Sequence, residues 1–114
     1  MSKCTLPFPP SANRYWRRAG HHTYVSAEAK EYKQTAGWIA TAAGIECLQG
    51  EISITLQFYR PTKQGDLDNR IKVLLDSLNG IAWEDDKQIV EIHAYRHEAG
   101  KRDLARVEVE IVAL

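Results

Sequence analysis

The chain has 114 residues, a length that suits one domain with a single modest core. Hydrophobic residues make up 44% and charged residues 26%, as in an ordinary globular protein, and the absence of any run of 18 apolar residues argues against a membrane span. No apolar segment opens the sequence, so we expect no secretory signal and a cytoplasmic location. Cys4 and Cys47 lie far apart and form no zinc pattern, and we expect both to be free thiols.

The formal net charge is zero, but the charges are unevenly distributed. The first 27 residues hold no acid and four basic side chains, which are Lys3, Arg14, Arg17 and Arg18. Residues 84–91 hold one lysine and four acids, which are Glu84, Asp85, Asp86 and Glu91. A basic phosphate-binding arm and an acidic metal-binding cluster would leave this distribution, and so would the uneven charge of a solvated surface.

The first half of the chain predicts short strands and one helix. A short strand is expected before Pro7 and another at 23–25. Ser26 is typical of a helix N-cap, and residues 27–43 repeat small and apolar side chains at helical spacing until Gly44 ends the helix. Residues 51–60 then alternate apolar and polar side chains, which predicts a half-buried strand that Pro61 terminates.

The second half predicts a helix followed by two strands. At residues 68–79, four apolar side chains fall within one arc of about 100°, and Gly80 follows at the position of a left-handed cap. Two strands, at 88–97 and 104–112, flank a charged turn that contains Gly100 and are expected to form a hairpin. The fold class is therefore predicted to be α+β, a single small domain over residues 1–114 with two helices packed on one small mixed sheet.

Acidic and basic side chains gather around the second predicted helix. Asp68, Lys72 and Asp76 follow one another at intervals of four, so they share one helix face beside the buried arc. Asp66 precedes this helix, and a pair of aspartates at 85–86 follows it. We expect the polar groups on the helix face, which Asn69 joins, to line the edge of a cleft.

Such a cluster suits the hydrolysis of a phosphodiester. Carboxylates alone repel phosphate, whereas carboxylates that hold Mg²⁺ stabilise the negative charge that develops at phosphorus. A nearby lysine can offset charge on the scissile phosphate or its leaving group. The ligands would be Asp66, Asp68 and Asp86, and the lysine would be Lys72.

Each residue alone also has a structural interpretation. Asp66 or Asp68 could cap the helix or favour its dipole, and Lys72 could be a surface partner of Asp68. Asp76 could pair with a neighbouring basic side chain, and the acidic pair could be a solvated turn. The D-x-D-N run is not an EF-hand, because that loop's further ligands are missing.

Taken together, the motifs resemble the signature of RusA-type crossover junction endodeoxyribonucleases, which are Holliday junction resolvases. The stretches that carry the resemblance are DLDN at 66–69, Lys72, Asp76-x-Leu78, Gly80, W-x-DD-x-QI at 83–89, LPFPPSANRY at 6–15 and VSAE at 25–28. They span residues 6 to about 97 in the family's order and spacing. The combined pattern is specific, although its pieces are not.

The resemblance implies an Mg²⁺-dependent endonuclease, with Mn²⁺ as a possible substitute, that cuts four-way DNA junctions in recombination and repair. Within the family, two aspartates of D-x-D-N and the second aspartate of the later pair bind the metal, and a lysine is essential. These positions are Asp66, Asp68, Asp86 and Lys72. The family is homodimeric, so that two sites cut two opposed strands; the neutral net charge of this chain departs from what a DNA-binding protein would be expected to carry.

Five basic side chains are candidates for phosphate contacts: Arg14, Arg17, Arg18, Arg60 and Lys63. The aromatic residues Tyr15 and Trp16 could stack on unpaired bases, although core packing of at least one is favoured. Trp83 is expected to be a core anchor that sets the turn at 85–86.

Two other functions fit the same residues. A non-catalytic module could bind branched DNA with a structural acid cluster, and it would show no metal-dependent cutting. A metal-dependent hydrolase of nucleotides or small phosphoesters would show turnover with no preference for branched DNA.

Overall fold

The computed structural model describes residues 2–10, 16–19, 22–61 and 67–114. Side chains are described for these residues except 16–19, 22–25 and Asn69. The elements are β1 (Ser2–Pro7), β2 (Trp16–Ala19), β3 (His22–Val25), α2 (Ala27–Ala42), β4 (Ile52–Arg60), α3 (Leu67–Leu78), the 3₁₀ turn η1 (Asp86–Gln88), β5 (Ile89–Glu98), the 3₁₀ turn η2 (Arg102–Leu104) and β6 (Arg106–Ala113).

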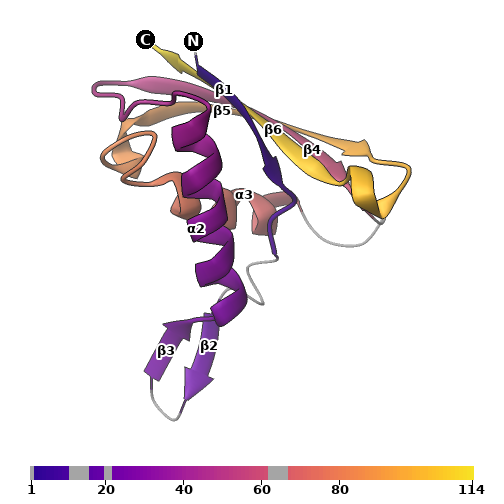
Figure 1. Ribbon diagram of the computed structural model, residues 1–114. Helices are drawn as coiled ribbons and strands as arrows, with labels where there is room; N and C mark the ends of the chain where they lie inside the picture. Colours follow the sequence, from indigo (N-terminus) through magenta and orange to yellow (C-terminus); the bar gives the residue numbers. More distant parts are fainter. Residues whose placement is uncertain (1, 11–15, 20–21, 62–66) are drawn as a thin grey trace.

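A four-stranded mixed sheet forms the centre of the fold, with strand order β1-β6-β4-β5. β6 pairs antiparallel with both β1 and β4, whereas β5 pairs parallel with β4. Both helices lie on the same side of this sheet (Figure 1). The predicted α+β class, with two helices packed on one small mixed sheet, is confirmed.

The core lies between the helices and the sheet, and β4 explains why. Its alternate residues Ile52, Ile54, Leu56 and Phe58 are at most 1% exposed. Cross-strand partners share a face of a sheet, and the partner of Leu56 on β6 is a buried valine, Val109. The predicted alternation of β4 therefore defines the buried face of the sheet.

The predicted hairpin between the last two strands is wrong. β5 and β6 each pair with β4, on opposite sides of it, and do not pair with each other. The periodicity of a strand indicates that it is half buried but does not identify its neighbour. The apolar β4 takes the central position, and a parallel β4–β5 pair needs a crossover connection, which contains α3.

The predicted helix boundaries are confirmed to within a residue or two. The hydroxyl oxygen of Ser26 accepts from the backbone N–H of Ala29 at 3.1 Å and caps α2. Gly44 follows α2 with φ of 81°, and Gly80 follows α3 with φ of 84°. These left-handed conformations favour glycine and end both helices.

A second, two-stranded sheet pairs β2 with β3. The strand expected at 23–25 is confirmed, whereas its partner at 16–19 was not predicted. Figure 1 shows this ribbon beyond the N-terminal end of α2, away from the main sheet. Both cysteines are free, with Cys4 buried and Cys47 exposed. No helix in the described ranges is long and apolar enough to cross a membrane.

Candidate metal centre

Helix α3 presents the polar face that the sequence predicts. Asp68 and Lys72 are exposed, and Asp76 is partly buried. At 1.5 Å of rise per residue, Asp68 and Asp76 lie about 12 Å apart along the helix axis, with Lys72 midway. The three side chains therefore form a row along α3.

The chain turns sharply after α3 and brings the acidic pair back toward the helix. The backbone N–H of Gly80 donates to the carbonyl of Trp83 at 2.7 Å, and that of Leu48 donates to the carbonyl of Ala82 at 2.9 Å. Trp83 is fully buried. It is the core anchor expected from the sequence, and it fixes the start of the acidic turn.

The two adjacent aspartates have different surroundings. The Asp85 carboxylate caps η1 by accepting from the backbone N–H of Lys87 at 2.9 Å. One oxygen of the Asp86 carboxylate accepts from the indole N–H of Trp83 at 2.8 Å. Asp85 is therefore used to build the turn, whereas Asp86 is held in place by a neighbouring side chain. The sequence alone left the role of Asp85 open.

Asp76 and Asp86 belong to one electrostatic site. Burial raises the pKa of Asp76 above its ordinary value, and the negative charge of Asp86 raises it further. The ammonium groups of Lys72 and Lys33 act in the opposite direction on the same pKa. Asp86 of η1 and Lys33 of α2 therefore both lie within electrostatic range of Asp76 on α3.

Sequence reasoning did not identify Lys33 as part of this region. Lys33 lies on α2, far from the D-x-D-N run in the chain, and nothing in its local sequence distinguishes it from a surface lysine. Only the packing of α2 against α3 brings it within reach of Asp76. A contact between helices of this kind has no signal in periodicity.

Two of the three predicted metal ligands, Asp68 and Asp86, belong to the part of the chain that the structure describes. Asp66 lies outside the described residues. Among the residues that are described, no group of three His, Cys, Asp or Glu side chains is arranged to hold a metal ion. Asp68 and Asp86 offer carboxylate oxygens, the ligand type that Mg²⁺ prefers, and Mg²⁺ sites commonly combine one or two carboxylates with water.

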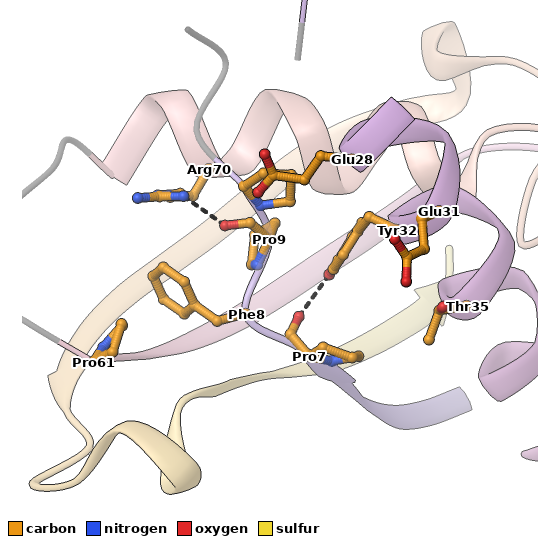
Figure 2. A pocket seen from close by; sticks show the side chains of 10 residues that line it. Pro7, Phe8, Pro9, Glu28, Glu31, Tyr32, Thr35, Pro61 and Arg70 are labelled. Carbon is orange, nitrogen blue, oxygen red and sulfur yellow. Dashed lines mark hydrogen bonds between the residues drawn. The ribbon is translucent and has the colours of Figure 1, made fainter. Parts of the chain in front are cut away.

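The N-terminal segment is fastened beside the start of α3, as Figure 2 shows. The guanidinium of Arg70 donates to the Pro9 carbonyl at 2.6 Å and lies 5.0 Å from the centroid of the Phe8 ring. The Tyr32 hydroxyl on α2 donates to the Pro7 carbonyl at 2.7 Å. Arg70 and Tyr32 thus tie this segment, which leads to the predicted basic arm, to both helices.

These contacts border a pocket of about 500 Å³. Its lining combines apolar and acidic side chains and comprises Pro7, Phe8, Pro9, Pro10, Glu28, Glu31, Tyr32, Thr35, Pro61 and Arg70. Figure 2 shows Arg70 and Phe8 on one side and Tyr32 with Glu31 on the other. The pocket therefore lies where the N-terminal segment meets α2 and α3.

The predicted phosphate contacts are only partly within the described structure. Arg14 and Lys63 lie outside it. Arg17 and Arg18 lie on β2, of which the structure describes the backbone alone. The guanidinium of Arg60 donates to Glu98 at 2.5 and 3.1 Å, an ion pair at the end of the β4–β5 pair. Because a carboxylate already engages Arg60, a phosphate there would compete with Glu98.

Comparison with known proteins identifies the family of this fold and site. The family model described as endodeoxyribonuclease RusA matches residues 7–112, which include the whole of α3, η1 and the main sheet apart from most of β1 and the end of β6. This chain belongs to the RusA family. The RusA family is one of endodeoxyribonucleases, and the resemblance inferred from the sequence motifs is confirmed.

Three RusA relatives illustrate how closely the chain follows the family. The crossover junction endodeoxyribonuclease RusA of Escherichia coli K12 is 33% identical over 113 residues, which cover 96% of this chain and 92% of the relative. The enzyme of the same name from Shigella sonnei is 32% identical, and that from Enterobacteria phage 82 is 31% identical, each with the same coverage. The similarity therefore spans nearly the full length of this chain and of each of these relatives.

Proposed function

We propose that this chain is an Mg²⁺-dependent endonuclease that resolves four-way DNA junctions by paired phosphodiester hydrolysis, in DNA recombination and repair in the cytoplasm. Membership of an endodeoxyribonuclease family supports the reaction, and the names of the relatives, crossover junction endodeoxyribonucleases, support the branched substrate. The observation that carries the proposal is the oriented carboxylate of Asp86, which lies in one electrostatic site with Asp76 and Lys72 of α3.

In this proposal Asp66, Asp68 and Asp86 hold the cation, and Mn²⁺ could replace Mg²⁺. When bound, the cation supplies Lewis-acid polarisation of the scissile phosphoryl group. Lys72 donates to a phosphate oxygen or the leaving oxygen as negative charge develops there. Water adds to phosphorus as the bond to the leaving oxygen breaks, and that oxygen is released with a proton. Of these groups, Asp68 and Lys72 lie one helical turn apart on α3, and Asp86 lies on η1.

Contacts to the DNA backbone are proposed for Arg14, Arg17, Arg18, Arg60 and Lys63. Each would neutralise phosphate charge and give the complex a dependence on salt. The basic arm follows the segment that Arg70 and Tyr32 fasten. This anchoring supports a fixed origin for the arm beside α3, and so beside the proposed scissile phosphate.

We further propose that the active form is a homodimer, because two opposed strands must be cut. A feature that supports self-association is the edge strand β5, which pairs with β4 alone in the described sheet. β5 is ten residues long, contains no proline, and exposes Val90, Ile92 and Tyr95 at 46–49%. The free backbone groups of an edge strand are a template for strand pairing with another chain.

The function is tested by incubating the protein with four-way, flap and linear duplex DNA, in Mg²⁺ and in EDTA. We expect Mg²⁺-dependent cutting of the four-way junction in preference to the linear duplex. The control variant Asp68→Asn should bind the junction as well as or better than the natural chain but should not cut it, because a ligand charge is lost and phosphate repulsion falls. Cutting in EDTA, or binding without any cutting, would contradict the proposal.

A further inference from the structure

Trp83 contributes the main contact that orients Asp86. Its side chain is fully buried, and its indole N–H donates to one Asp86 carboxylate oxygen at 2.8 Å. A buried N–H needs an acceptor, because an unpaired donor keeps the full cost of its lost hydration. Here the acceptor is a partly exposed carboxylate of a proposed metal ligand rather than a backbone carbonyl of the core.

Gln88 fastens the same turn from its other end. Its side-chain carbonyl accepts from the backbone N–H groups of Glu84 and Asp85, at 2.8 and 2.9 Å. Its side-chain amide donates to the carbonyls of Leu48 and Gly50, each at 2.9 Å. With four hydrogen bonds in place, the amide has used its donors and both acceptor sites.

The backbone of the acidic turn is therefore fixed independently of Asp86. Gln88 joins the turn to the loop at 48–50, and Asp85 caps η1. What these contacts leave undetermined is the rotation of the Asp86 side chain, and the Trp83 N–H determines it. The motif W-x-D-D-x-Q thus has a physical explanation, in which the flanking residues build and orient the turn around one aspartate.

We infer that Trp83 is a positioning residue, whose indole N–H holds the Asp86 carboxylate in the orientation that binds a divalent cation. This inference rests on the proposed function, in which Asp86 is a metal ligand. Donors that hold ligating carboxylates typically account for about 10- to 100-fold in metal affinity or activity, because they fix the ligand before the ion arrives. A purely structural Trp83 would instead affect stability and leave metal affinity unchanged.

The test measures Mn²⁺ affinity directly, from the electron paramagnetic resonance signal of free Mn²⁺, and the Mg²⁺ concentration for half-maximal junction cleavage. We expect Trp83→Phe to weaken Mn²⁺ binding about 10- to 100-fold and to raise the Mg²⁺ midpoint similarly. At saturating Mg²⁺ the cleavage rate should return toward that of the natural chain. A folded Trp83→Phe variant with unchanged Mn²⁺ affinity would overturn the inference.

A matched control separates lost volume from the lost donor. Phe58→Leu removes buried aromatic volume from β4, where Phe58 is 1% exposed and packs edge-on against Phe8. It should lower the melting temperature and leave Mn²⁺ affinity unchanged. If it weakened Mn²⁺ binding as much as Trp83→Phe does, the effect would follow general destabilisation and the inference would fall.

A second variant covers the case in which Trp83→Phe does not fold. Benzothienylalanine placed at position 83 keeps the shape of the bicyclic ring and replaces only the N–H with sulfur. It should show the same loss of Mn²⁺ affinity with less loss of stability. If the natural chain itself bound no Mn²⁺, the proposed function would fail together with the inference; if it bound Mn²⁺ and both variants matched it, only the inference would fail.

Discussion

At the residue scale, Lys72 best separates an enzyme from a DNA-binding module. Its ammonium lies in one electrostatic site with Asp76, on the exposed face of α3. If it bridged surface carboxylates alone, its removal would matter little, since exposed ion pairs contribute little to stability. If it faces the scissile phosphate, its charge acts mainly in the transition state, where one such group is typically worth about 10²–10³ in rate.

We therefore expect Lys72→Ala to keep a melting temperature close to that of the natural chain and to bind junctions. It should cut them at least about a hundredfold more slowly. Lys72→Arg should rescue only part of the rate, because the guanidinium is a planar fork rather than a point charge. Single-turnover cleavage with saturating enzyme isolates the chemical step. An unchanged single-turnover rate for the alanine variant would show that Lys72 only bridges surface carboxylates and takes no part in the chemical step.

Asp76 gives a prediction about pH. Its pKa is raised in the folded chain, by burial first and then by Asp86, above the ordinary value of 3.8. Its contribution to stability is therefore fully present below the unfolded pKa and is lost as the pH rises through the folded pKa. Asp76→Asn should raise the melting temperature of the metal-free protein at pH 7, with the advantage disappearing near pH 3.

The measurement is thermal unfolding in EDTA across that pH range, with Glu91→Gln as a control for the loss of one exposed acid. Glu91 lies on β5 and is not among the groups that shift the pKa of Asp76. Its side chain pairs with His93 at 3.7 Å, but an exposed pair contributes little, so its removal should leave the melting temperature nearly constant. An Asp76→Asn variant less stable than the natural chain at pH 7 would show that the carboxylate is a favourable partner of Lys72 or Lys33 on balance.

At the scale of elements, the turn that follows α3 determines where Asp86 lies. Gly80 has φ of 84° and no atom within 4 Å of an added Cβ, and Gly100 between β5 and β6 has φ of 83° and equally open surroundings. Gly80→Ala and Gly100→Ala should each lose about 1–2 kcal/mol of stability through backbone strain alone. Only Gly80→Ala should also slow cleavage, because its turn carries Trp83 and Asp86.

Chemical denaturation and single-turnover cleavage of both variants check this prediction. If both variants cut at the rate of the natural chain, the turn tolerates a shift at Gly80 and the prediction is wrong. If both variants lose the same fraction of the cleavage rate, activity follows global stability and the prediction is wrong as well.

Individual elements were predictable because their signals are local. Ser26, Gly44 and Gly80 mark helix ends through hydrogen bonding and backbone conformation, and the alternation in β4 marks its buried face. The pairing of β5 with β4 was not predictable, because neighbours in a sheet are chosen by packing across the whole chain. The same limit applies to the site: the motif singled out Asp86, but only the fold distinguishes its oriented carboxylate from the capping carboxylate of Asp85.

At the scale of the whole molecule, the edge strand β5 predicts how two copies associate. Sedimentation should give a mass near twice the 12.9 kDa of one chain. Ile92→Lys replaces an exposed apolar side chain of β5 by a charge and should shift the protein toward monomer, since burying an unpaired charge in an interface is costly. Thr41→Lys, which adds the same charge at an exposed polar position of α2, is the control and should leave the mass unchanged. A dimer unaffected by Ile92→Lys would place the interface elsewhere.

The most direct measurement uses a supercoiled plasmid that extrudes a cruciform, because that cruciform is a four-way junction which disappears after a single nick. Two cuts within one encounter release linear plasmid, whereas single cuts leave nicked circles. We predict linear product in Mg²⁺, and none in EDTA or with Asp68→Asn. Accumulation of nicked circles without linear product, or equal cutting of a plasmid that lacks the inverted repeat, would contradict paired cleavage of a junction.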